Sequence, residues 1–298
     1  MAFISSGAQG GLITPCSIQV FPNTELADPD YLQRFGMQTR IIELQEIHGR
    51  VRTPEWVAEE EEIVVATSAM PADDWARALR FSWVTMTMHS LKLGFYLMAW
   101  LVDRCGARHS EFLQFLAEGD FPAADFPRWS AQLAAFSSKI EALRAGQGRG
   151  CVLPDYGDIY WDEEEACFLR LSKDFDGFFA ELRDLVLEFL ERRGVAVSIA
   201  ELDDVLAYQS LVIPRPDGRS SQRARFEHDL PAWFDALFAT EPQPLRRTPT
   251  VVEANQPDFA GELGRFARET ILWGRKSGTM LAQLRVETQA AADEAALV

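Results

Sequence analysis

The sequence predicts an α+β protein that is mostly helical, in which a helical domain carries a few short strands. Two observations predict this class. Several long segments have the apolar spacing of helices, with proline or acidic residues at the start and glycine at the end. The segments with the alternation typical of strands are short. With 298 residues, of which 47% are hydrophobic, the chain can form one large domain or two smaller ones.

The first element that we expect is a strand at residues 16–21, where polar and apolar residues alternate. It stops at Pro22, and a short helix follows that Asp28 can cap and Gly36 can end. A lone strand leaves an edge of unpaired backbone groups. We therefore expect it to be the last strand of a sheet whose other strands lie outside this chain. It should be ordered only where it pairs with residues 40–48 or with another chain.

Residues 40–48 and 63–67 are predicted as a second and a third strand. The acidic run at residues 59–62 between them is expected to be a solvated turn rather than a metal site. Pro71 then opens a long helix, because proline at the first position and acidic residues in the first turn suit a helix start. This helix is expected to continue toward Gly94.

The rest of the chain is predicted to be helical at first and mixed after a linker. Further helices are expected at residues 110–117, 126–145, 175–193 and 199–209. Residues 158–171 are expected to be irregular or β. Residues 213–221 are the clearest linker, since proline, glycine and serine gather there. After the linker we expect strands at residues 223–227 and 248–253 and helices at residues 231–238 and 259–273.

The charge of the chain argues against nucleic acid and membranes as partners. The formal net charge is −16, with 45 acidic and 29 basic residues, and such a surface repels phosphate backbones and anionic lipid. His89 and Lys92 interrupt the most apolar stretch, residues 81–102, which favours a buried core helix, broken near Gly94, over a membrane span. The N-terminus lacks a signal-peptide pattern, and the four cysteines are too widely spaced for a disulfide framework. We therefore expect a cytoplasmic protein with reduced thiols.

The four histidines are the first candidates for a site, but their spacing gives no metal pair. None lies in an HxH, HxxxH or HExxH pattern. His48 lies near the end of the second predicted strand beside Glu46 and Arg52, and this group either lines a pocket or is a plain surface strand end. His89 is expected to be a core histidine. Since no GxSxG, GxGxxG or Walker-type loop occurs, the sequence contains no recognisable catalytic constellation.

Four segments, taken together and in this order, resemble radical S-adenosylmethionine (SAM) enzymes of the cobalamin-binding type. The segments are residues 21–31 with 34–36, residues 63–67 with 70–75, residues 161–166 with 168–169, and residues 266–269 with 273–276. The first resembles the region just after a late barrel strand, and the second resembles the strand and helix start that follow it. The third is similar to a mid-domain signature of the same proteins, and the fourth to their closing helix.

In the enzymes that it resembles, a cobalamin-binding domain precedes a partial TIM-type barrel that holds a [4Fe–4S] cluster on a CxxxCxxC loop. This sequence has no such loop. The resemblance therefore implies a C-terminal region that caps the barrel and shapes the substrate pocket without being catalytic by itself. It implies a remnant of the barrel end at residues 1–36, a mainly helical domain at 37–212, and a linker with a terminal strand and helix subdomain at 213–298. A truncated gene, a split gene or an incomplete gene assignment would each give this organisation.

Position at the predicted strand ends makes four residues candidates for the substrate pocket, namely Asn23, Glu46, His48 and Arg52. The resemblance implies no metal and no cofactor in this chain, although the complete enzymes use a [4Fe–4S] cluster, SAM and often cobalamin. It implies a separate radical SAM barrel or cobalamin-binding chain as the partner. The alternative is a stand-alone helical protein-interaction module, with the first strand as its pairing edge.

Overall fold

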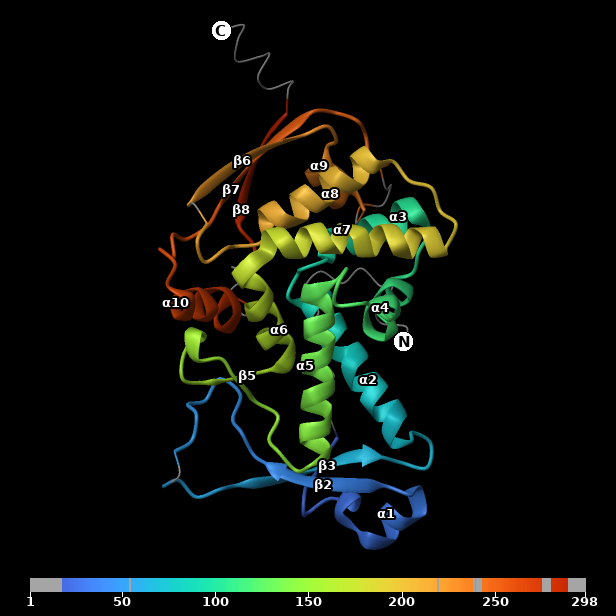
Figure 1. Cartoon of the computed structure of the whole chain (residues 1–298), viewed down its shortest axis with the longest axis vertical. Helices are drawn as coiled ribbons and strands as arrows, with labels where there is room; N and C mark the ends of the chain where they lie inside the picture. Colours follow the sequence, from blue (N-terminus) through green and yellow to red (C-terminus); the bar gives the residue numbers. More distant parts are fainter. Residues whose placement is uncertain are drawn as a thin grey trace, which may run out of the picture. The chain divides into compact units, whose positions relative to one another are not determined.

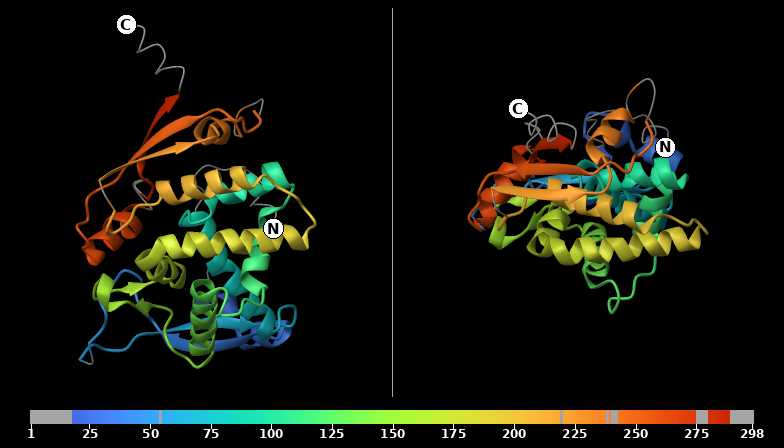
Figure 2. Two further views of the ribbon diagram at one scale, coloured as in Figure 1. Left: turned by 45° about the horizontal axis from the view of Figure 1, so that its top comes forward. Right: turned by 90° about the horizontal axis from the view of Figure 1, so that it is seen from above.

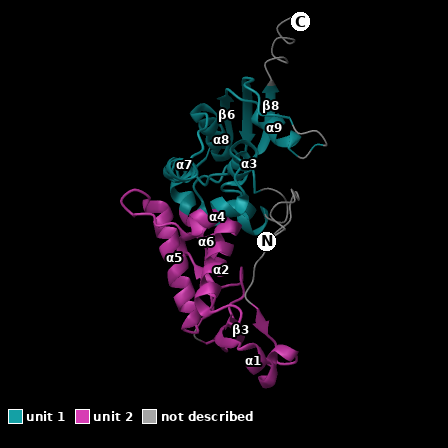
Figure 3. Ribbon diagram, turned by 90° about the vertical axis from the view of Figure 1, so that its right-hand side faces the viewer, with its two compact units in different colours: residues 1–11, 88–112, 171–298 teal, residues 12–87, 113–170 magenta. Residues whose placement is uncertain are grey.

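The computed structural model describes residues 18–288 except 54, 219, 238, 240–242 and 275–279. The chain forms two compact units, each built from segments that are distant in sequence (Figure 3). Unit 2 comprises Leu12–Thr87 and Leu113–Arg170, and unit 1 comprises Met1–Gly11, Met88–Phe112 and Leu171–Val298. The described residues are mainly helical with small antiparallel sheets, which confirms the α+β class. The domain boundaries predicted at residues 36 and 212 stay a prediction.

Unit 2 contains a three-stranded antiparallel sheet in the order β1-β3-β2. The strands are β1 (Gln19–Val20), β2 (Gln38–Glu43) and β3 (Glu60–Ala66). The pairing predicted between residues 16–21 and 40–48 is wrong, because β1 pairs with β3 and Gln19 lies opposite Ile63. The beginning of the predicted strand, at residues 16 and 17, lies outside the described residues. The last four residues of β3 are all buried, which suits the central position in the sheet.

Acidic residues open β3, where the sequence predicts a solvated turn. Glu61 accepts hydrogen bonds from Arg149 and Gln19. Glu62 accepts one from the Thr39 hydroxyl at 2.5 Å. Because these donors satisfy the carboxylates across the sheet, the acidic run can continue as a strand, and the turn prediction is wrong for that reason.

Helices lie on both sides of this sheet (Figure 1). They are α2 (Ala72–Thr85) and α5 (Pro127–Arg144) on one side and α1 (Pro29–Phe35) on the other. The rings of Trp83 and Phe136 join α2 to α5, with their centroids 5.6 Å apart. As predicted, Asp28 caps α1 through the Asp30 amide, and Gly36 ends it with a φ of +57°.

A short hairpin and a helix complete unit 2. They are β4 (Cys151–Val152), β5 (Tyr160–Trp161) and α6 (Glu163–Leu171). The prediction of an irregular or β segment at residues 158–171 holds for β5 and is wrong from Glu163 onward. Three glutamates occupy the first turn of α6, where the positive end of the helix dipole favours acidic side chains.

In unit 1, one helix packs against two others and against a sheet. The elements are α3 (Phe95–Cys105), α7 (Phe175–Arg192), α8 (Ile199–Val212) and the strands β6 (Ser221–Phe226), β7 (Thr250–Asn255) and β8 (Gln283–Thr288). α8 contacts α3, α7 and β6, and it lies between α7 and the antiparallel sheet β6-β7-β8 (Figure 2). The buried apolar residues of α8, Leu202, Val205, Leu206 and Val212, recur at the spacing of one broad helical face.

The remaining helices include two short π-helical turns. They are α4 (His109–Glu118), which is divided between the units, α9 (Leu230–Ala236), α10 (Leu263–Ala267), and the π-helices η2 (Met86–Ser90) and η5 (Arg268–Leu272). The helix predicted from Pro71 toward Gly94 is α-helical to Thr85 and continues as η2 to Ser90, and α3 begins directly after Gly94, where the break was predicted. Within the described parts of the chain, every helix is too short or too polar to traverse a bilayer.

Candidate functional site

The segment that follows β2 runs along β5 of the same unit. The His48 amide donates to the Tyr160 carbonyl at 2.7 Å, and the Tyr160 amide donates to the Gly49 carbonyl at 3.0 Å. The Val51 amide donates to the Asp158 carbonyl at 3.1 Å. These bonds fix the backbone of residues 46–52 against β5 and against the start of α6.

His48 connects this segment to a buried carboxylate. Its Nε2 lies 2.8 Å from Oε2 of Glu165, whose side chain is fully buried, whereas the His48 side chain is 27% exposed. The Asp162 amide donates to the same carboxylate oxygen at 3.2 Å. The Trp161 ring system meets the imidazole in an edge arrangement, with the centroids 5.7 Å apart. The carboxylate therefore sets the orientation of the imidazole, as the acidic partner of a histidine commonly does.

The backbone of His48 is strained. Its φ is +67°, in the left-handed region, which costs a residue other than glycine about 1–2 kcal/mol. Two hydrogen bonds stabilise this strained conformation: the His48 amide donates to the Tyr160 carbonyl, and the imidazole pairs with Glu165. Strained backbone that is held in this way is frequent at functional sites.

The neighbouring buried acid of α6 is fully paired. Glu163 accepts from Arg170 Nη2 at 2.5 Å and lies 2.6 Å from the Cys151 sulfur. Burial raises the pKa of the Cys151 thiol, and the charge of Glu163 adds to this effect. One donor beside these acids stays unused: the indole Nε1 of Trp161 is buried without a hydrogen-bond partner among the described residues. Such a donor is suited to a small polar group.

Three of the four residues predicted for the pocket lie on the segment 46–52. Arg52 donates through its guanidinium to Glu59 at 2.6 Å, and Glu46 is exposed in the turn before His48. Asn23 lies in an exposed turn after β1, and no hydrogen bond among the described residues joins it to this segment. The expectation that His48 ends a strand is wrong, because β2 stops at Glu43 and a left-handed residue cannot extend it.

Sequence reasoning missed the partners of His48, although a signal was available. Glu165 and Trp161 both lie in the segment 161–166 that carries part of the family resemblance, but they are far from His48 along the chain. No functional role was predicted for the glutamates of that segment. The available signal was the run of glutamates at the start of α6, one of which is the buried carboxylate that pairs with His48.

The three cysteines that the structure describes, Cys105, Cys151 and Cys167, do not fit an iron–sulfur cluster. Burial raises the pKa of Cys105 to about 11 and that of Cys167 to about 12, which opposes the thiolate form that binds iron. Cys105 belongs to unit 1, whereas Cys151 and Cys167 belong to unit 2. In the part of the chain that the structure describes, no three His, Cys, Asp or Glu side chains are grouped to hold a metal ion.

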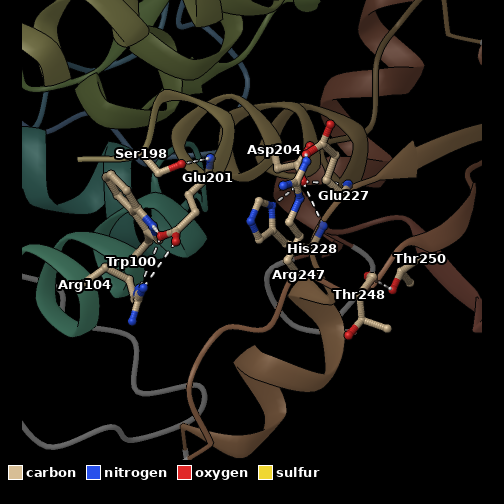
Figure 4. Close-up of polar contacts among 10 residues, drawn as sticks. All are labelled: Trp100, Arg104, Ser198, Glu201, Asp204, Glu227, His228, Arg247, Thr248 and Thr250. Carbon is tan, nitrogen blue, oxygen red and sulfur yellow. Dashed lines mark hydrogen bonds and ion pairs between the residues drawn. The ribbon is translucent and has the colours of Figure 1, made fainter.

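A second histidine–carboxylate pair, in unit 1, has a structural role (Figure 4). His228 Nδ1 lies 2.8 Å from Asp204 Oδ2, and the same oxygen accepts the amides of His228 at 3.0 Å and Glu227 at 2.8 Å. His228 is only 5% exposed. These bonds attach α8 to the turn after β6. Three donors on one oxygen make a rigid joint, so this pair is not a candidate site.

Unit 1 also contains an open pocket of about 670 Å³ between α7, α8 and the start of β6. The predicted linker at residues 213–221 forms part of its wall. In this wall, the Arg215 guanidinium connects α7 to α8. Its Nη1 lies 2.8 Å from Asp176 Oδ1, and its Nη2 lies 2.7 Å from Ser210 Oγ. The acidic and basic groups of the lining are balanced, so its charge does not point to one ligand class.

Comparison with known proteins identifies relatives of this chain. No protein-family model matches the sequence. The chain is 26% identical over 249 residues to the cobalamin-dependent radical SAM methyltransferase TokK of Streptomyces tokunonensis. The aligned region covers 72% of this chain and 33% of TokK. It is 25% identical over 289 residues to the 2-(S-pantetheinyl)-carbapenam-3-carboxylate methyltransferase of Streptantibioticus cattleyicolor. This aligned region covers 85% of this chain and 39% of that protein. The chain thus spans only 33–39% of the length of these relatives. These matches confirm the resemblance on which the sequence analysis rests: the chain is similar to part of a cobalamin-dependent radical SAM methyltransferase and to part of a second methyltransferase.

Proposed function

We propose that this chain is the C-terminal region of a radical SAM methyltransferase of the cobalamin-binding type, in which it caps the barrel and shapes the substrate pocket. The observation that carries the proposal is the similarity of most of this chain to about a third of two such methyltransferases. The absence of a CxxxCxxC loop from the sequence supports a region that does not hold the cluster. The cluster, SAM and cobalamin would then be bound by the remainder of the enzyme or by a separate chain.

Within this proposal, the segment 46–52 faces the substrate. His48 is the partly exposed member of its pair, and the buried Glu165 holds one ring nitrogen so that Nδ1 can contact a ligand. Glu46 and Arg52 flank it on the same segment. The pair would orient the substrate or hold a proton near it. Methyl transfer is the reaction that we infer for the complete enzyme, because both relatives are named methyltransferases.

The first test sequences the DNA before the Met1 codon. If that DNA encodes a radical SAM barrel, the barrel is then co-expressed and purified with this chain. A reading frame with CxxxCxxC, in frame or displaced, supports the proposal if its product co-purifies with this chain or forms one polypeptide with it. The complete assembly should then cleave SAM under reducing conditions and methylate a substrate. An unrelated neighbouring gene and no co-purifying barrel would overturn the proposal.

Substitutions in that assembly test the site itself. His48→Ala should lower the methylated product formed per SAM cleaved, while SAM cleavage and the cluster spectrum persist, because the pair is proposed to act on the substrate alone. Arg50→Ala is the matched control, since Arg50 lies two residues away with a side chain that is 74% exposed. If both variants retain the wild-type ratio of product to SAM cleaved, the segment does not face the substrate.

The alternative is a stand-alone helical interaction module, and one observation favours it. β1 is an outer strand of its sheet, and the adjoining Ile18 and Phe21 are 51% and 58% exposed. An outer strand with exposed apolar neighbours can pair with a strand of another protein. An unrelated neighbouring gene, combined with a captured partner that protects residues 18–21 from hydrogen exchange, would support this alternative.

A further inference from the structure

Basic and aromatic side chains gather where η2 gives way to α3, within unit 1. Lys92 Nζ lies 3.6 Å from the centroid of the Phe95 ring. The His89 ring meets the same phenyl ring in an edge arrangement, with the centroids 5.2 Å apart. His109 is close enough to His89 to interact with it electrostatically. The three side chains His89, Lys92 and Phe95 thus form one partly exposed cluster.

The backbone holds this cluster in a strained shape. Lys92 has a φ of +66°, in the left-handed region that a lysine rarely occupies. The Gln209 side-chain amide donates to the Lys92 carbonyl at 2.6 Å, and the Gln209 Oε1 accepts from the Tyr96 amide at 2.8 Å. The residues on either side of Lys92, Leu91 and Leu93, are fully buried. The lysine is therefore fixed in place by its surroundings rather than extended freely into solvent.

In the described part of the chain, no carboxylate pairs with the charge of this cluster. Among the described residues, the Lys92 ammonium forms no ion pair, and burial lowers its pKa to about 8 without an acidic group to raise it. Burial, Lys92 and His109 together lower the pKa of His89 to about 4. In a chain with 45 acidic and 29 basic residues, an uncompensated basic cluster is unexpected.

The cluster also has an unused hydrogen-bonding atom. His89 Nδ1 is buried and has no partner among the described residues. Buried polar atoms normally have a partner, and an exception requires an explanation. His89 belongs to the π-helix η2, and π-helical turns occur frequently at functional sites. A bound anion would pair with the ammonium and could accept a hydrogen bond from the imidazole.

We propose that His89, Lys92 and Phe95 form a binding site for a small oxyanion, a carboxylate or a phosphate group, whose apolar part lies against the phenyl ring. The ammonium supplies the opposite charge, and the neutral imidazole supplies a hydrogen bond. The aromatic ring supplies a surface for the carbon skeleton that carries the anion. This inference does not rest on the proposed function, because the cluster lies in unit 1 and the segment 46–52 lies in unit 2.

The test measures how oxyanions protect Lys92 from modification by trinitrobenzenesulfonate in the intact chain. The sequence has four lysines, and Lys139 is the internal control, because its ammonium donates to the carbonyls of Gly148 and Gly150. Inorganic phosphate or acetate should slow the labelling of Lys92 several-fold relative to sodium chloride at equal ionic strength. The labelling of Lys139 should be unchanged. Protection by either anion supports the site, and the stronger protector identifies the group.

Variants add a second measurement. Phosphate should shift the ring signals of His89 in carbon–proton NMR spectra of the wild type and of Lys92→Arg, and not in those of Lys92→Met. If chloride protects Lys92 as well as phosphate and acetate do, or if Lys139 is protected equally, the proposal is overturned. The labelling measurement uses the wild-type chain, so this conclusion stands even if Lys92→Met fails to fold.

Discussion

At the scale of single residues, the conformation of His48 makes an unusual substitution prediction. Alanine and glycine both remove the imidazole, but only glycine accepts a φ of +67° without strain. We expect His48→Gly to be more stable than His48→Ala by about 1 kcal/mol. Glycine avoids the energetic penalty of the left-handed conformation, and this gain is reduced by the entropy that glycine adds to the unfolded chain. Urea unfolding followed by circular dichroism measures the difference.

Arg50 provides the control for that comparison. It lies two residues further along the same segment and is not among the residues with positive φ. The order should therefore reverse, with Arg50→Ala more stable than Arg50→Gly by roughly 0.5–1 kcal/mol. If glycine were the less stable choice at both positions, the left-handed conformation of His48 would be contradicted.

The sequence could point to His48 and could not point to its partner. Histidine beside acidic and basic neighbours is recognisable in a sequence, so Glu46, His48 and Arg52 could be grouped in advance. The pairing with Glu165 depends on a fold that brings together residues 117 positions apart. The left-handed backbone of His48 was equally hidden, because nothing local to a histidine requires it. Asn23 was grouped with the others by position alone, and the turn that contains it is exposed.

At the scale of elements, β1 is short enough to be dispensable. It pairs with β3 through two residues, whereas β3 also pairs with β2 along six. We expect deletion of residues 1–21 to leave the helices folded, because long helices contain most of the buried apolar side chains. Far-UV circular dichroism and urea unfolding test this, and residues 18–21 of the intact chain should exchange their amide hydrogens quickly. Cooperative unfolding of the whole shortened chain would show instead that β1 is integral to the fold.

The elements that the sequence predicted well are those with strong end signals. α5 and α7 begin and end within one residue of the predicted bounds. Proline starts α5 and a capping aspartate starts α7, and glycine follows the end of each helix. The errors occur where distant partners decide. Hydrogen bonds from Arg149 and Thr39 allow the acidic run to form a strand. No strand was predicted at β8, although polar and apolar residues alternate in it. The break predicted near Gly94 is present, since α3 begins directly after Gly94, but the π-helical geometry of η2 just before it was not predicted.

At the scale of the whole molecule, the purified chain should bind neither iron nor SAM tightly. The sequence lacks CxxxCxxC, and the thiols of Cys105, Cys151 and Cys167 have raised pKa values because they are buried. Anaerobic reconstitution with iron and sulfide should therefore give no stoichiometric cluster. A charge-transfer band, with iron and sulfide in the ratio of a [4Fe–4S] cluster, is the result that contradicts this expectation.

The division into units could not have been predicted from the sequence. Sequence signals such as the proline-rich linker mark places where the chain is locally irregular. The units are defined by contacts between distant segments, and residues 37–212 contribute to both of them. The general class was accessible because helical periodicity is a local property. The arrangement of the helices was not, because it depends on which apolar faces meet.

The way in which the chain alternates between the units has a consequence for how this protein can be cut and rearranged. The chain leaves unit 2 after Thr87, returns at Leu113 and leaves again after Arg170. A single protease cut between residues 88 and 112 would therefore place the two halves of unit 2 on different polypeptides that still hold together. By the same reasoning, no one continuous stretch of the gene encodes unit 2 alone. Recombination could transfer that unit to another protein only together with the excursion through residues 88–112.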